Sequence, residues 1–228
     1  RLLAPFAKYG LATWWYVPGH TIETFPDAVK QVVDAGHEIA HHGWTHRPPA
    51  SLTREGEEAE LMRGNEAIKR ISGEYARGYR SPSWDLSPHS VELLLKHNFI
   101  YDSSMMGNDY TPYYARQGDV IELEKPAGFG RPTPLIELPI HWSTDDSPHF
   151  EFVRTETSIR QGLRNANDVM GNWLNDFLYL KQTMEWGVLT YTCHPFIIGR
   201  GHRIMMLERL IRKLKGEGAG FQRMEGTG

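Results

Sequence analysis

The sequence predicts an α/β protein with a parallel sheet, either open or closed into a barrel. Strand patterns alternate with amphipathic helix patterns along most of the 228 residues, and parallel strands need such helical crossovers. Polar residues suited to chemistry also fall where several of the predicted strands end. With 40% apolar residues, the chain is long enough for one well-buried core, so we expect a single domain over residues 1–228.

The first half of the chain predicts a regular series of helices and strands. Gly10 and Gly36 stop the first two helices, Thr24 is the expected cap of the second, and Pro18 stops the first strand. The expected elements are a helix over 2–9, a strand over 11–17, a helix over 26–35, a strand over 37–42, a helix over 53–72, a strand over 77–80, a helix over 87–97 and a strand over 99–103.

The second half is less regular. Residues 105–134 are rich in Gly, Pro, Tyr and Asp and predict a long functional loop, which is also a candidate contact for a homo-oligomer. A break is expected near Gly171, within the longest helical pattern. The expected elements are a strand over 135–140, a helix over 157–186, a strong strand over 188–193, a basic helix over 203–215 and a strand near Phe221.

Charge and cysteine content exclude several functional classes. The formal charge of -3 and the pI near 6.4 provide no basic face for nucleic acid and no polybasic segment for a membrane surface. The single cysteine, Cys193, excludes an intramolecular disulfide framework and favours a cytoplasmic protein. No apolar run reaches the roughly 18 residues that span a bilayer, so we expect a soluble chain.

The hexapeptide HHGWTH at residues 41–46 is the most informative motif. Imidazole is the commonest protein ligand of zinc, and His42 and His46 could close on one ion across a short turn. Because strand neighbours face opposite ways, we do not expect His41 to share that ion. A set of hydrogen-bonded loop histidines without metal is the alternative interpretation.

Four further strand ends carry residues suited to chemistry. Active sites of parallel α/β folds lie at this edge of the sheet. Each candidate also has a structural interpretation, such as a surface ion pair, a turn cap or a hydrogen-bonded histidine. Cys193 beside His194 is expected to be a buried apolar residue rather than a nucleophile. The candidates are Arg80, Trp84, Asp102, His141, Trp142 and His194.

Three motifs in order resemble the polysaccharide deacetylases, carbohydrate esterase family 4, including their peptidoglycan deacetylase-like and allantoinase-like branches. HEIAHHGWTH resembles the family's histidine motif, RGYRSPSW its arginine-proline-aromatic motif and LTYTCHP its late histidine motif. YGLATWWYVPG resembles the segment that precedes the histidine motif. The resemblance covers nearly the whole chain. It implies a distorted (β/α)7 TIM-like barrel and a metal-dependent hydrolase that cleaves amide C–N bonds, other than peptide bonds, in N-acetylated sugars of a polysaccharide or peptidoglycan.

The resemblance also implies roles for single residues. A divalent metal, with zinc the favoured ion, would be held by His42 and His46. His194 would be the general acid that protonates the leaving amine, and Arg80 would orient the catalytic carboxylate. The substrate groove would be lined by Trp84, Asp102, Trp142 and His141.

The family's aspartate pair, which supplies a third metal ligand and the general base, has no counterpart in this sequence. Residues 1–36 contain only Glu23, Asp27 and Asp34 as carboxylates, on or next to a predicted helix. We therefore expect a chain that lacks the first barrel strand, retains metal weakly and shows little or no turnover.

Two alternatives to a deacetylase stay open at this point. The same fold could hydrolyse a cyclic imide, a ureide or another small amide, for which a closed pocket would be needed rather than an open groove. The chain could also be a non-catalytic carbohydrate-binding relative that keeps Trp84 and Trp142 as stacking surfaces.

Overall fold

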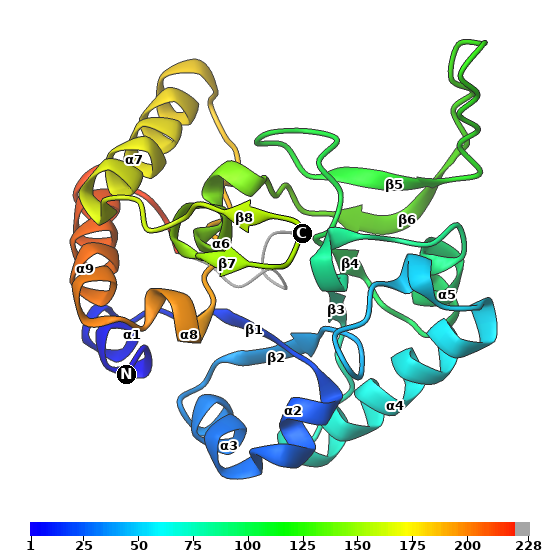
Figure 1. Cartoon of the computed structure of the whole chain (residues 1–228), viewed down its shortest axis with the longest axis horizontal. Helices are drawn as coiled ribbons and strands as arrows, with labels where there is room; N and C mark the ends of the chain where they lie inside the picture. Colours follow the sequence, from blue (N-terminus) through cyan, green and yellow to red (C-terminus); the bar gives the residue numbers. More distant parts are fainter. Residues whose placement is uncertain (222–228) are drawn as a thin grey trace. The chain divides into compact units, whose positions relative to one another are not determined.

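A six-stranded, mostly parallel sheet lies within residues 13–139 (Figure 1). The structure is a computed structural model and describes residues 1–221. Five strands are parallel, and β5 joins the edge antiparallel to β6. The α/β class predicted from the sequence is confirmed. In sheet order the strands are β1 Trp14–Val17, β2 Glu38–His41, β3 Gly78–Tyr79, β4 Tyr101–Asp102, β6 Arg131–Glu137 and β5 Tyr113–Gln117.

Helices cover this sheet where the sequence carries apolar helical faces. Helices α3 and α4 pack against β2, α2 packs against α4, and α5 packs against β5 and β6 (Figure 1). The helix expected over 53–72 is α4, and Thr53 is its cap, because its hydroxyl accepts a hydrogen bond from Gly56 N at 3.1 Å. The helical elements of this unit are α2 Gly19–Thr24, α3 Pro26–Asp34, η1 Pro49–Ser51, α4 Arg54–Ser72, η2 Pro82–Trp84 and α5 Ser90–Lys96.

Residues 1–12 and 140–221 form a second compact unit. Helix α7 packs against α9, and α8 contacts both α6 and α9. Trp173 is fully buried in this unit, where its ring lies against Tyr191. The elements are α1 Leu3–Tyr9, η3 Trp142–Thr144, α6 Asp146–Phe150, β7 Val153–Arg154, β8 Ile159–Arg160, α7 Ala166–Thr183, α8 Pro195–Ile198 and α9 Gly201–Gly216.

The strand expected over 188–193 is wrong. Only Thr192 pairs, in a single parallel bridge to Asp145, and the rest of the segment is irregular. Its hydrogen bonds run to distant segments: Thr192 N donates to Thr144 O at 3.0 Å, and the Tyr191 hydroxyl donates to Trp173 O at 2.6 Å. Apart from the buried Thr190, residues 188–193 are half-buried, so the apolar run reflects partial burial rather than a ladder of backbone hydrogen bonds.

The long helix expected over 157–186 is also corrected. It is shorter, because β8 occupies residues 159–160 and α7 begins at Ala166. It passes unbroken through Gly171, where nothing lies within 4 Å of the position that a Cβ would take. A glycine on an exposed helix face weakens the helix without ending it.

Two smaller expectations also fail. The segment 105–134 is not a loop throughout, because β5 and the start of β6 pair within it. Thr24 does not cap α3. It is the last residue of α2, and its hydroxyl donates to His20 O at 2.7 Å. The strand expected near Phe221 reaches outside the described residues, and Phe221 itself is irregular.

No helix among residues 1–221 combines the length and the apolar character that crossing a membrane requires.

Candidate functional site

His41, the first histidine of HHGWTH, has a structural role. It lies on β2, is fully buried, and uses both ring nitrogens: Nε2 bonds to Leu61 O at 2.9 Å and Nδ1 accepts from Gly43 N at 3.1 Å. Burial lowers the pKa of His41 to about 4. A ring with both nitrogens occupied cannot bind a metal, in agreement with the argument from strand alternation.

His42 follows the end of β2 and is oriented by a neighbouring strand. Its Nδ1 lies 2.7 Å from Arg80 O, which is one residue past β3. Because a carbonyl can only accept, Nδ1 carries the proton and Nε2 keeps its lone pair. Burial lowers the pKa of His42 to about 3, so the ring is neutral. A neutral imidazole with one nitrogen fixed is the form in which histidine binds metals.

His46 lies in the loop after β2, next to His42. Their ring centroids are 4.8 Å apart, with an angle of 76° between the planes. His46 has a positive φ of 63°, which is uncommon for a residue with a side chain. The structure thus brings together the two histidines that the sequence proposed as ligands. Their donor chemistry fits a divalent ion of the zinc type at two coordination positions.

A complete set of three protein ligands is not found around this pair. Among residues 1–221, no carboxylate, thiol or further imidazole forms a three-residue ligand cluster with His42 and His46. Catalytic zinc usually has three protein ligands and an open position. Among the described residues, His42 and His46 are thus the two side chains that would hold an ion at this place.

Arg80 is a rigid, buried cation beside the histidine pair. Its Nε donates to Ser103 O at 3.0 Å and its Nη2 donates to Ser103 Oγ at 2.7 Å. Its guanidinium carbon lies 4.2 Å from the centroid of the Tyr16 ring. These contacts fix the guanidinium, and the backbone carbonyl of the same residue holds His42. Its role in orienting a catalytic carboxylate stays a prediction.

Asp102 does not line a groove, which corrects the expectation from the family motif. It is fully buried at the end of β4, in register with Glu137 at the end of β6. Its Oδ1 accepts from Ser104 Oγ at 2.6 Å. Glu137 Oε1 accepts from the backbone N–H groups of Ser104 and Met105, both at 2.7 Å. Asp102 is therefore part of the interior network, and a fully buried carboxyl does not meet a substrate.

The second oxygens of this carboxyl pair, Asp102 Oδ2 and Glu137 Oε2, are buried without a hydrogen-bond partner. Each of the two carboxyls influences the pKa of the other. Burial raises the pKa of Asp102 to about 6, and burial together with the Asp102 charge raises the pKa of Glu137 well above its usual value. Sequence analysis missed Glu137. A lone acid within the apolar run LIELPI was the available signal.

This pair predicts a dependence of stability on pH. In the folded chain Asp102 keeps its proton to a higher pH than in the unfolded chain, so the folded state is favoured at low pH and loses that advantage as pH rises from about 4 through about 6. We expect this contribution to the free energy of unfolding to fall by roughly 2 kcal/mol over that range. Urea titrations from about pH 4 to about pH 7 measure it.

The control for that titration is Asp102→Asn, which keeps the shape and a hydrogen-bond donor toward Glu137 but does not titrate. Its unfolding free energy should fall less over the same pH range than that of the unsubstituted chain. Equal slopes for the two proteins would contradict a raised pKa for Asp102.

Trp84 lies in a strained turn after β3. Ser83 and Trp84 have positive φ values of 58° and 55°, directly after Pro82. Trp84 N donates to Ser81 O at 3.0 Å, and its side chain is half-buried. Two successive left-handed residues with side chains are costly and typical of sites under functional constraint. Its role as a platform for a sugar ring stays a prediction.

His194, in the second unit, is held by Asp146. His194 Nδ1 lies 2.6 Å from Asp146 Oδ1, and Asp146 Oδ2 accepts from His194 N at 3.0 Å. Asp146 is completely buried. Burial raises its pKa, and the bonds to His194 oppose that rise. A carboxylate bound to Nδ1 fixes the tautomer and stabilises the charged ring, as in catalytic Asp–His pairs.

Asp145 gives this site a third group that could bind a metal. One ligand atom from each of Asp145, Asp146 and His194 lies within 4.8 Å of the others. The geometry nevertheless favours a hydrogen bond between Asp146 and His194, because the 2.6 Å between His194 Nδ1 and Asp146 Oδ1 is a hydrogen-bond distance. Asp145 Oδ1 already accepts from Ser147 N at 2.6 Å, as the cap of α6. The sequence analysis singled out neither aspartate.

The second unit also contains His141, Trp142 and Cys193, which the sequence analysis discussed. His141 caps η3, where its Nδ1 accepts from Ser143 N at 3.1 Å. Trp142 is 41% exposed, as a stacking surface requires. Burial raises the pKa of the Cys193 thiol well above its usual value, so the thiol stays protonated and is a poor nucleophile.

Comparisons with known proteins match these observations. The family model described as polysaccharide deacetylase matches residues 1–101. A peptidoglycan deacetylase of Helicobacter pylori is 39% identical over 224 residues, which cover 94% of this chain and 76% of that protein. The peptidoglycan deacetylase-like protein FGM2 of Gibberella zeae is 28% identical and covers 94% of this chain and 69% of its own length.

Solved structures share the fold. A candidate polysaccharide deacetylase from Mycobacterium smegmatis superposes with a TM-score of 0.80 at 30% identity, over 93% of this chain and 68% of that chain. The Puue allantoinase superposes with a TM-score of 0.77 at 20% identity, over 98% of this chain and 68% of that one, a likeness that extends to the fold alone. The (β/α)7 fold class expected from the motifs is confirmed by these neighbours.

Proposed function

Since the chain belongs to the polysaccharide deacetylase family, whose reaction is the hydrolysis of the amide bond in N-acetylated sugars, we propose that its substrate is peptidoglycan and its metal is zinc. The substrate is supported by the name of the Helicobacter pylori relative at 39% identity. The metal is supported by one observation above all. His42 Nδ1 donates to Arg80 O at 2.7 Å, which leaves Nε2 as a fixed, neutral donor beside His46.

The first unit supplies the ligands and a fixed cation. His42 and His46 would hold the ion, which when bound lowers the pKa of water and polarises the acetyl carbonyl. The buried Arg80 guanidinium favours negative charge nearby, and its contacts to Ser103 and Tyr16 prevent it from moving.

The acid of the reaction is His194. In this proposal His194 gives a proton to the departing amine, since amide cleavage requires a protonated leaving group. Asp146 binds Nδ1 and the backbone N–H of the same residue, so the ring is oriented and its other nitrogen carries the transferable proton.

Acetate release tests the proposal. The chain is incubated with N-acetylglucosamine oligomers or with peptidoglycan, with and without excess Zn²⁺, and the double variant His42→Ala, His46→Ala is the control. Because two imidazoles retain an ion weakly, we expect little release from the chain as isolated and a zinc-dependent increase that the double variant lacks.

Two results would overturn parts of this function. Release equal to that of the double variant at saturating Zn²⁺ contradicts deacetylation by this chain. Hydrolysis of allantoin without acetate release from the glycans contradicts the substrate and favours the ureide alternative.

A further inference from the structure

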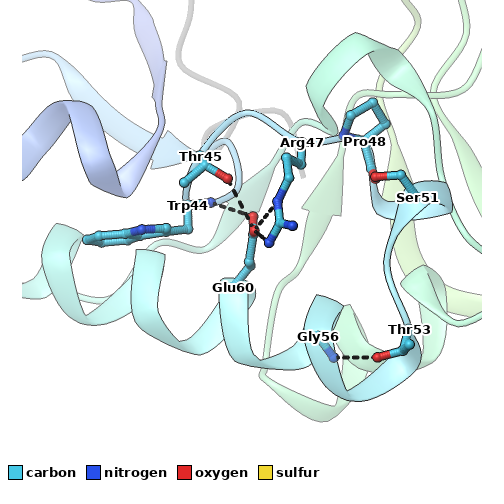
Figure 2. A network of polar contacts seen from close by, with 8 residues as sticks. All are labelled: Trp44, Thr45, Arg47, Pro48, Ser51, Thr53, Gly56 and Glu60. Carbon is cyan, nitrogen blue, oxygen red and sulfur yellow. Dashed lines mark hydrogen bonds and ion pairs between the residues drawn. The ribbon is translucent and has the colours of Figure 1, made fainter.

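The residues on both sides of His46 converge on one carboxylate, that of Glu60 (Figure 2). Glu60 lies on α4 and is almost completely buried. Its Oε2 accepts from Trp44 N at 3.3 Å. Its Oε1 accepts from Thr45 Oγ1 at 3.2 Å and from Arg47 Nε and Nη2 at 3.0 and 2.5 Å. Three of the four residues from 44 to 47 therefore bond to a single side chain, and the fourth is His46.

The loop needs such a restraint at His46. With φ at 63°, His46 occupies the left-handed region, which side chains disfavour and asparagine or glycine would adopt more easily. Such a conformation persists only where the surrounding structure determines it. The bonds from Trp44, Thr45 and Arg47 to Glu60 fix the chain before and after this position.

The opposite side of the loop is held by α2. Gly19 N donates to Gly43 O at 3.0 Å and His20 N donates to Trp44 O at 2.9 Å. The Arg63 guanidinium, also from α4, lies 3.7 Å from the centroid of the Trp44 ring. The loop carbonyls are thus held by α2 and the loop donors by α4. Glu60 supplies the acceptors on the α4 side.

We propose that Glu60 is a positioning residue, whose carboxylate fixes the backbone of residues 44–47 so that the His46 ring faces His42, and thereby sets the affinity of this pair for a divalent cation. The geometric part depends only on the loop, and the part about affinity rests on the proposed function. Glu60 lies on a helix, away from the reacting groups, and acts through His46. Supporting groups of this kind typically change metal affinity by about 10- to 100-fold when they are removed.

Glu57 provides a matched control on the same helix. It is buried like Glu60 and accepts hydrogen bonds from Ser87 Oγ and Ser90 Oγ. Glu57→Ala therefore also leaves hydroxyl groups without their acceptor in the α4 region, but neither of these hydrogen bonds involves residues 44–47. A loss that is only structural should affect Glu57→Ala and Glu60→Ala alike.

The first test needs no metal. Proton NMR of the histidine rings should show a nuclear Overhauser effect between His42 and His46 in the unsubstituted chain and in Glu57→Ala, because the ring centroids are 4.8 Å apart. We expect Glu60→Ala to lose it. Persistence of the effect in Glu60→Ala, or its loss in both variants, would overturn the proposal.

The second test measures Co²⁺ binding by competition with a chelating dye. We expect Glu60→Ala to weaken binding by about 10- to 100-fold and Glu57→Ala to stay within about twofold of the unsubstituted chain. Equal affinities for the chain and Glu60→Ala would overturn the role in affinity.

Two further arms keep the result interpretable. Should Glu60→Ala fail to fold, Glu60→Gln replaces it, because the amide keeps one acceptor oxygen and loses the ion pair with Arg47. We then expect a smaller loss of the ring contact and of Co²⁺ affinity. Unchanged ring contacts and affinity in Glu60→Gln would overturn the proposal. Should the unsubstituted chain not bind Co²⁺ at all, the proposed metal function fails, and the ring contact alone decides the positioning role.

Discussion

Replacing Asp146 by asparagine is expected to lower kcat for acetate release by about 100- to 10,000-fold, the range that a positioned general acid contributes. The Asp146 carboxylate binds both His194 Nδ1, at 2.6 Å, and His194 N, at 3.0 Å. An asparagine in the same place keeps its oxygen for the backbone N–H and turns its NH₂ group toward Nδ1. Nδ1 then has to accept, which imposes the wrong tautomer and removes the charge that stabilises the protonated ring.

Two measurements check this expectation. Steady-state acetate release at saturating Zn²⁺ gives kcat, and nitrogen-15 NMR of the histidine ring reports the tautomer of His194 even where turnover is low. We expect the proton to move from Nδ1 to Nε2 in Asp146→Asn.

Asp145→Asn is the matched control. Asp145 Oδ1 is 3.8 Å from His194 Nδ1 and caps α6 through Ser147 N, and asparagine caps helices about as well as aspartate. We expect kcat within a few-fold of the unsubstituted chain. A loss as large as that of Asp146→Asn would instead indicate that Asp145, Asp146 and His194 bind a metal together.

Trp173→Ala is expected to reduce the free energy of unfolding by about 3–5 kcal/mol, the usual cost of truncating a fully buried tryptophan. Trp173 has no exposed surface. Its Nε1 donates to Ser143 O at 2.8 Å, and its backbone O accepts from the Tyr191 hydroxyl. Ser143 lies in η3, just before Asp145 and Asp146. The substitution thus empties the core beside the segment that holds His194.

Urea denaturation of the whole chain measures this loss. Trp186 is 57% exposed, so Trp186→Ala should stay within about 0.5 kcal/mol of the unsubstituted chain. Trp173→Phe keeps much of the ring volume but removes the N–H group, and should fall between the two. A loss below about 1 kcal/mol for Trp173→Ala would show that this core is not packed as described.

Local sequence signals predicted most elements within residues 1–103. Thr53 followed by a charged amphipathic run predicted α4, and Gly36 after an apolar helical face predicted where α3 stops and β2 begins. Such signals act over one or two turns of chain, because caps and φ preferences are properties of neighbouring residues. Beyond residue 103 the apolar patterns misled, as at 188–193, because burial and strand pairing share one pattern.

Partners from distant parts of the chain were not predictable in this way. Glu60 acts on residues 13 to 16 positions away, Glu137 pairs with an acid on a neighbouring strand, and Asp146 binds a histidine 48 positions later. An isolated acidic residue has the same appearance in a sequence whether it is solvated or buried against a partner.

The sequence alone therefore determined the α/β class and the family, and it predicted the site histidines His42, His46 and His194, because motif spacing and helix–strand alternation are properties of neighbouring residues. The tertiary structure decided what each of these side chains can do. Both nitrogens of His41 are occupied, His42 is fixed by a carbonyl of the next strand, and Asp102 is buried away from any groove. Protonation, burial and hydrogen-bond partners depend on contacts between strands and helices far apart in sequence, and only folding makes those contacts.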